Sequence, residues 1–389
     1  MNHREQRHLT LTGLELGPPQ VLGAIRLVPL LRARPTEDLR LGLQPHASSA
    51  QMVALDARDD GLKYVSFIPH GLMVRFSEDG RPVDAPEGSA ALGSWMSASG
   101  KKARPGRAPP VLHRMVKRAG ADGFRMLPLH LAMEGFLSLC FAGPDIAWPE
   151  YSQRAVRRGL DPRLESSWSG HAIFGLEEAL RLFEIHEGQV GMLVFVADAL
   201  ASAFVVPHQT DYRLLHRTMI EDFFGELIFR YAGQHPKLGR LEAGVDASEV
   251  HDLDGLERAI EAVRGDWSEL AASMASGLSD QPARFETIRK AGPFVLERFV
   301  GDLECGEETH IGELIRRRDG TVEYLKTFRL SAAQVRRARL LELLATHDWH
   351  LDRAAAAEGQ SRALLLDRIQ RAGFEYLIRP EARGRRPRA

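Results

Sequence analysis

The segment Leu340–Phe374 reads LLELLATHDWHLDRAAAAEGQSRALLLDRIQRAGF, and it contains two short helical patterns separated by a turn. Residues 354–357 are all alanine, which is small enough to let two helix backbones approach closely. Gly359 can adopt the positive φ of a tight turn, and Ser361 can cap the helix that follows. A helix, a glycine-containing turn and a second helix predict a helix-turn-helix, a motif that commonly enters the major groove of DNA.

The second helix of this unit has one apolar face, because Leu365 and Ile369 are four residues apart. Its cations, together with those of the arginine-rich C-terminus, are the candidates for contacts with DNA. The predicted DNA-binding residues are Ser361, Arg362, Arg368, Arg371, Arg383, Arg385 and Arg386. The last three belong to a tail whose composition resembles the Arg-Gly-Arg-Pro core of an AT-hook, which enters the narrow minor groove.

The charge of the chain is divided unevenly along its length. The net charge of the 389 residues is −1, but the part from Ser331 onward carries 12 Lys/Arg and 7 Asp/Glu. That part is therefore positive by five charges, and the first 330 residues are negative by six. An acidic body with a basic end suits a protein that touches nucleic acid with one end.

Several classes of protein are disfavoured by composition. Cys140 and Cys305 form neither a metal-ligand spacing nor a disulfide framework, which fits a reducing compartment. No secretory signal is evident at residues 1–13, and no window approaches the roughly 18 apolar residues of a membrane span. We therefore expect a cytoplasmic protein without membrane contact, metal ion or cofactor, and the common enzyme motifs are absent as well.

The first part of the chain alternates between strand and helix patterns. Gly23–Leu31, Gly191–Ala197 and Leu200–Val206 have the apolar character of buried strands. A helix is expected from Thr210, as its N-cap, to about Ala232. We interpret residues 8–235 as an α+β accessory or sensing domain.

A connecting region, residues 250–330, is expected to hold a helix at Leu253–Ser276 and a β-hairpin around Asp319-Gly320. A capping box of Ser331 and Gln334 then opens the C-terminal helices. The predicted fold class is α+β, with a mixed strand and helix N-terminal domain, a helical and hairpin connector and a C-terminal all-helical helix-turn-helix. The last two units are residues 331–379 and a basic tail, 380–389.

Two other functions compete with DNA binding. A hydrolase could place its site at His208, Asp211, His216 or Glu221, although Asp211 and His216 are five residues apart and therefore point in different directions on a helix. A protein-interaction adaptor could instead dock a partner on residues 364–366, which are all leucine. The catalytic residues of such an enzyme remain unknown, and the sequence favours a protein that is not an enzyme.

The C-terminal unit resembles the Fis-type helix-turn-helix of bacterial enhancer-binding activators over about 35 residues. The matching positions are Ala354-Ala355, Gly359, Arg362, Leu365, Ile369 and Gly373. Leu364, Leu366 and Asp367 depart from the family pattern, and Asp367 replaces a typical cation. The resemblance implies a homodimer that binds paired half-sites on double-stranded DNA, and the departures imply fewer phosphate contacts.

Residues 10–232 resemble, in outline, the domain associated with ADP-ribosylglycohydrolases and rhodanese-phosphatases in bacterial conflict systems. The points of likeness are Leu14–Gly17, Gly23–Leu31 and the closing strands Gly191–Val206 with the long helix after them. This resemblance implies a sensing or accessory domain encoded in a conflict or stress operon, with a protein partner from the same operon. Together, the two resemblances imply a DNA-binding transcriptional regulator.

Overall fold

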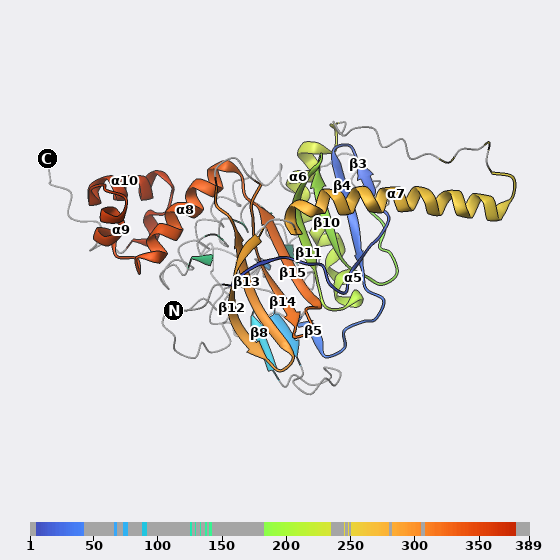
Figure 1. The fold of residues 1–389 in the computed structure, drawn as a ribbon, viewed down its shortest axis with the longest axis horizontal. Helices are drawn as coiled ribbons and strands as arrows, with labels where there is room; N and C mark the ends of the chain where they lie inside the picture. Colours follow the sequence, from blue (N-terminus) through green and yellow to red (C-terminus); the bar gives the residue numbers. More distant parts are fainter. Residues whose placement is uncertain are drawn as a thin grey trace, which may run out of the picture.

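One large antiparallel sheet dominates the protein (Figure 1). The computed structural model describes residues 5–42, 183–234, 250–279, 282–304 and 308–378, with short pieces and single positions between 66 and 141 and at 245 and 248. The ten strands of the sheet follow the order β1-β12-β13-β14-β15-β11-β10-β4-β2, and β3 pairs with β4. The strands are β1 (Glu5–His8), β12 (Pro282–Ala291), β13 (Phe294–Gly301), β14 (His310–Arg317), β15 (Val322–Arg329), β11 (Ala199–Val205), β10 (Gln189–Val196), β4 (Ile25–Leu31), β2 (Glu15–Leu16) and β3 (Gln20–Leu22).

Two smaller sheets accompany the large one in the described residues. One has three strands, β5 (Leu39–Gly42), β7 (Met73–Phe76) and β8 (Gly88–Ala91), and all of its pairs are antiparallel. The other pairs β6 (Ser66–Phe67) with β9 (Arg125–Met126) in parallel.

Both faces of the large sheet are covered, as the side chains of β10 show. Met192 and Val194 belong to one hydrophobic cluster, whereas Leu193 and Phe195 belong to another. Successive residues of a strand point to opposite faces of the sheet, so these two clusters lie on opposite sides. A strand that is buried on both faces has the continuous apolar sequence that β10 shows.

The join between β11 and β15, which we call the seam, is short. Its backbone register covers only two residue pairs. Side chains continue the seam beyond them, because the Ser202 hydroxyl donates to the Thr327 carbonyl at 2.7 Å and the Ala203 amide donates to the Thr327 hydroxyl at 2.9 Å. Phe204 and Tyr324 pack edge to face across it, with 6.1 Å between ring centroids. The seam therefore unites strands from the two halves of the sequence.

Three consecutive helices cover one face of the sheet. They are α5 (Gln209–Thr218), the π-helix η4 (Met219–Phe223) and α6 (Gly225–Tyr231). Phe223 is fully buried, and its ring lies 6.5 Å from that of Phe204 and 6.1 Å from that of Phe328. These aromatic contacts fix the helices on the sheet.

The long helix α7 (Leu253–Ser279) touches the opposite face and then leaves the body. Ala271 is buried in the cluster on that face, and the Arg26 guanidinium carbon lies 5.2 Å from the Trp267 ring centroid. The N-terminal half of α7 projects past the edge of the sheet (Figure 1). Although α7 has 27 residues, neither it nor any other described helix is long and apolar enough to cross a membrane.

Helices follow β15 directly at the C-terminal end. They are α8 (Ala332–Thr346), α9 (Leu351–Ala357), α10 (Arg362–Arg371) and the 3₁₀ helix η5 (Glu375–Leu377). The expected capping box at the start of α8 is confirmed, because both the Ser331 and Gln334 side chains bond to the backbone of the other residue. Buried residues of these helices belong to the same hydrophobic cluster as Tyr324 and Phe328 of the sheet, and an ion pair joins Arg284 of β12 to Glu342 of α8.

The predicted fold class was wrong. Residues 250–330 are not a connector, because β12–β15 lie within the same ten-stranded sheet as the N-terminal strands. A separate all-helical helix-turn-helix unit is not shown either, since the C-terminal helices share their core with the sheet. The hairpin signal at Asp319-Gly320 was confirmed, with Gly320 at a φ of +94°, but such a local signal does not reveal which strands flank the hairpin.

Substituting Phe223 tests whether the aromatic contacts hold the helical layer on the sheet. We expect Phe223→Ala to lower the free energy of unfolding by about 3–5 kcal/mol, because it leaves a cavity beneath the helices. The control is Phe229→Ala, whose side chain is 47% exposed and whose loss should cost no more than about 0.5 kcal/mol. Urea unfolding followed by circular dichroism measures both, and equal losses would contradict the assignment.

Candidate functional site

The predicted turn between the last two long helices is present. Ala354 and Ala355 of α9 are buried, and Gly359 has a φ of +64°, as a left-handed turn position requires. Ser361 caps α10, because its hydroxyl accepts a hydrogen bond from the Leu364 amide at 3.3 Å. Ser361 therefore has a structural task at the position where contact with DNA was predicted.

The apolar face of α10 is held firmly, and its first turn is open to solvent. Leu365 and Ile369 are buried, at 0% and 1% exposure. Arg362, Ala363 and Leu364 are exposed. In helices that read the major groove, the residues of the N-terminal part contact the base edges. The exposed turn has the position that such contacts need.

Each arginine of α10 already has a carboxylate partner. The pairs are Arg362 with Asp352 at 3.2 Å, Arg368 with Glu358, and Arg371 with Asp367 at 2.9 Å. All three pairs lie near the surface, where an ion pair contributes only about 0–1 kcal/mol. Sequence reasoning missed the partners Asp352 and Glu358, although both stand ten residues before their arginine, across the turn.

The C-terminal helices are almost neutral. Residues 331–378 hold seven arginines and six acidic residues, whereas residues 379–389 hold five arginines and one glutamate. Most of the positive charge of the C-terminal end is therefore in the tail. Arg383, Arg385 and Arg386 lie outside the residues that the structure describes.

The leucines proposed as a docking face for a partner do not share one environment. Leu364 is 51% exposed, Leu365 is fully buried and Leu366 is partly buried against the core. Only Leu364 offers a substantial apolar surface to a partner.

Three of the four residues of the predicted hydrolase site have described side chains, and each has its own hydrogen-bond partners. His208, rather than Thr210, caps α5, and its Nδ1 accepts from the Thr210 amide at 3.1 Å. Asp211 is buried and binds the Arg40 guanidinium with both oxygens, at 2.8 and 3.1 Å. The side chain of Glu221 lies outside the described part of the structure.

His216 belongs to a different hydrogen-bond chain from Asp211. Gln189 donates to the Tyr212 hydroxyl at 2.8 Å, and that hydroxyl lies 3.0 Å from His216 Nδ1. His216 Nε2 lies 2.8 Å from the Phe183 carbonyl, so this nitrogen is the donor. Burial lowers the pKa of His216 below its ordinary value of 6.5, although the Phe183 carbonyl acts in the opposite direction. No group of three potential metal ligands occurs among the described residues.

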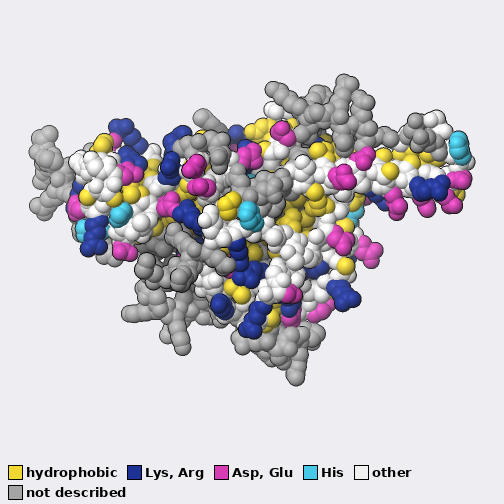
Figure 2. Space-filling model, viewed as in Figure 1, with side chains coloured by type: hydrophobic (Ala, Val, Ile, Leu, Met, Phe, Trp, Pro, Cys, Tyr) yellow, Lys and Arg dark blue, Asp and Glu magenta, His cyan; other side chains and the backbone are white. Residues whose placement is uncertain are grey.

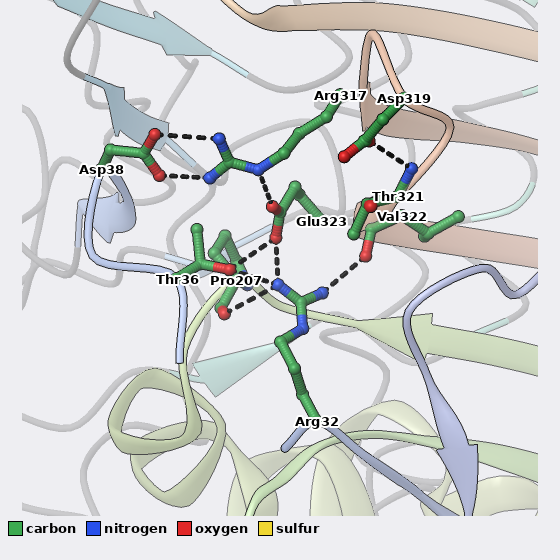
Figure 3. A network of polar contacts seen from close by, with 9 residues as sticks. All are labelled: Arg32, Thr36, Asp38, Pro207, Arg317, Asp319, Thr321, Val322 and Glu323. Carbon is green, nitrogen blue, oxygen red and sulfur yellow. Dashed lines mark hydrogen bonds and ion pairs between the residues drawn. The ribbon is translucent and has the colours of Figure 1, made fainter. Parts of the chain in front are cut away.

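A buried network of charges fixes the start of β15 (Figure 3). Glu323 lies at a β-bulge, because Ile315 pairs with Tyr324 and the next pair skips one residue. Its carboxylate lies between the guanidinium groups of Arg32 and Arg317. Thr36 donates to Glu323 at 2.6 Å, and Asp38 accepts from Arg317 at 3.0 Å. Every carboxylate of this network has a cation, so none stands ready as a general base.

Alternating charges also cross the sheet in one row, from β12 to β15. The register aligns Glu286, Arg298, Glu313 and Lys326 as successive cross-strand neighbours. Arg298 donates to Glu286 at 2.8 Å, and Lys326 donates to Glu313 at 2.7 Å. Burial lowers the pKa of Lys326, against the opposing effect of Glu313. We call this row the charge ladder.

A small cavity opens at the outer end of the charge ladder. It is lined by Cys140, Phe141, Arg284, Glu286, Arg298, Val300 and Glu342. Its volume of about 20 Å³ suits one water molecule rather than a substrate. Within the ladder the charges compensate one another in pairs. Charged residues inside otherwise apolar strands were the sequence signal for the ladder.

Comparison with known families places the chain in one of them. The family model described as ARPP-2 matches residues 9–292, which is well over half of the chain. The chain therefore belongs to the ARPP-2 family. The match ends in the β12–β13 turn, so it does not extend over β13–β15 or the C-terminal helices. No curated protein and no solved structure matches the chain.

The low pKa of His216 gives the stability of the fold a pH dependence. The unfolded chain takes up a proton as pH falls through 6.5, whereas folded His216 stays neutral until a lower pH. Stability should therefore fall between about pH 7 and pH 5, by at most about 1.4 kcal/mol per pH unit for this group. His216→Gln should flatten that slope in urea unfolding, whereas His251→Gln, at an exposed position, should not. An unchanged slope in the first variant would contradict the assignment.

Proposed function

We propose that this ARPP-2 family member is a DNA-binding transcriptional regulator that presents α10 to double-stranded DNA. The observation that supports this most is the first turn of α10. That turn is exposed, while Leu365 and Ile369 anchor the helix from behind. A helix that is fixed on one side and open on the other can enter the major groove without rearrangement.

The location of α10 in the molecule supports the same proposal. The helices α9 and α10 lie at one end of the long axis, away from the sheet (Figure 1). Lys and Arg side chains appear on the surface of this end, together with acidic ones (Figure 2). A duplex can therefore reach α10 without meeting the sheet.

The ion pairs of α10 set the expected strength of binding. Phosphates must displace Asp352, Glu358 and Asp367 from the arginines, and each exposed pair costs only about 0–1 kcal/mol to break. The exchange is therefore feasible, but it leaves the acidic groups near the phosphates. We infer weak binding to unrelated DNA, with affinity for a specific site arising from the exposed first turn.

We infer that the part of the chain before α8 acts as a sensing or interaction domain, with a partner protein encoded in the same operon, in a bacterial conflict or stress system. The proposed protein is a cytoplasmic homodimer.

A protein-interaction adaptor is the second candidate, and Leu364 is the observation in its favour. A leucine that is 51% exposed beside three neutralised arginines suits an apolar partner as well as it suits a thymine methyl group. The two functions differ in salt dependence, since phosphate contacts weaken steeply with salt and apolar contacts do not.

DNA binding is tested with the full chain and the DNA upstream of its own operon, by fluorescence anisotropy at low salt. Arg362→Ala and Arg368→Ala should each weaken binding and make the salt slope shallower by about one. Arg258→Ala, on the exposed surface of α7, is the matched control and should change neither quantity. The proposal fails if the unmodified protein shows no binding at micromolar concentration.

The tail adds a separate prediction. Deleting residues 383–389 should lower the affinity, because the deletion removes arginines that neutralise phosphates. The salt slope should become shallower in proportion to the number of phosphates that the tail neutralises, with little change in sequence preference. The comparison uses the upstream DNA and a scrambled duplex of the same composition. Unchanged affinity and slope after the deletion would mean that the tail takes no part in binding.

A further inference from the structure

The N-terminal half of α7 carries an apolar stripe that the part of the body described by the structure leaves open. This half extends beyond the sheet (Figure 1), and hydrophobic side chains are visible on the projecting helix between charged ones (Figure 2). Leu253 is 79% exposed and Leu256 is 36% exposed, while Ile260 and Val263 are half-buried. A helix that projects in this way needs another element to cover its apolar stripe.

The spacing of the stripe identifies the kind of element that fits. The apolar residues are Leu253, Leu256, Ile260, Val263, Trp267 and Leu270, with alternating spacings of three and four. This is the a/d heptad pattern of a coiled coil, in which a second helix covers the apolar stripe. The pattern continues to the edge of the body, where Trp267 and Leu270 remain half-buried.

The flanking charges identify a second copy of the same helix. Glu257 and Arg264 occupy the same flanking position of successive heptads, and both are exposed. In an antiparallel pair, this position faces its own equivalent on the other helix. With Ile260 opposite Val263, Glu257 of each copy comes beside Arg264 of the other, and the contact occurs twice because the pair is two-fold symmetric.

A parallel pair lacks this complementarity. In a parallel coiled coil, the residue just before an a position (position g) lies beside the residue just after the following d position (position e) of the other helix. That arrangement puts Asp252 of one copy beside Glu257 of the other, so two like-charge contacts replace the attractive ones. The antiparallel arrangement is favoured for this reason.

We propose that residues 253–270 of α7 form a dimerisation surface, which pairs antiparallel with the same segment of a second copy of this chain. The surface is independent of α10, since the two helices lie at different ends of the molecule (Figure 1). Dimerisation and DNA binding can therefore be tested, and can fail, separately.

The test measures the mass of the full chain by sedimentation equilibrium over a concentration series. The unmodified protein should be a dimer at tens of micromolar. Glu257→Arg and Arg264→Glu should each raise the dimer dissociation constant by about three- to tenfold, because each turns two attractive contacts into repulsive ones. The double variant Glu257→Arg/Arg264→Glu should restore the original constant, because it exchanges the two charges.

Two further variants separate the surface from general effects of charge. Arg258→Glu lies on the outer side of the proposed pair and should leave the dissociation constant unchanged. Ile260→Asp, in the apolar stripe of α7, should give a monomer, and its thermal unfolding midpoint should match that of the unmodified protein at concentrations low enough for both to be monomeric. The proposal is overturned if the unmodified chain is monomeric at these concentrations, or if the charge reversals and Ile260→Asp leave the mass unchanged.

Discussion

The seam between β11 and β15 is the contact on which the rest of the architecture depends. It joins β4, β10 and β11 to the strands that begin at residue 282, and its backbone ladder has only two residue pairs, whereas the other such join, between β1 and β12 at the opposite end of the sheet, has four. Ser202 and Thr327 lengthen it with side-chain hydrogen bonds, and Phe223 packs against rings from both sides. Strands so far apart in sequence lose loop-closure entropy when they come together, before their contacts stabilise the pair. We therefore expect the seam to form late in folding. Phe223 can contact both rings only when the two strands are joined.

Buried charges add order to the sheet rather than stability. In a buried ion pair, the attraction between the charges roughly offsets the free energy needed to remove both from water. A buried charge without its partner, in contrast, strongly destabilises the fold. The charge ladder therefore penalises any shift in strand register, because a slip would separate Glu313 from Lys326 inside the core. Glu323 does the same for the bulge of β15, since its carboxylate meets both guanidinium groups only when the bulge aims it toward them. Both groups therefore favour one arrangement of strands over its shifted alternatives.

The parts of the fold that were predictable from sequence are those with a local cause. The start of α7 at Leu253, the turn at Gly320 and the cap at Ser331 each follow from a few neighbouring residues. Strand order does not, because the pairing of β11 with β15 is decided by shape and charge over a long separation. The candidate site divides in the same way. The anchoring of α10 by its apolar face was foreseen, whereas the carboxylates that neutralise its arginines became visible only when the turn placed Asp352 and Glu358 beside them.

The positions of α7 and α10 restrict how dimerisation through α7 can be combined with DNA binding through α10. The two helices lie at opposite ends of the long axis, with the sheet between them (Figure 1). Nine strands of the sheet path at about 4.8 Å spacing give a breadth of roughly 40 Å for each copy. A dimer joined through α7 therefore holds its two α10 helices much further apart than the roughly 34 Å between half-sites one DNA turn apart. Such a dimer suits two separated sites, or two segments of duplex, which it would bridge. Binding to adjacent half-sites would instead require an interface near α10, and the heptad stripe of α7 would then have to serve a different contact.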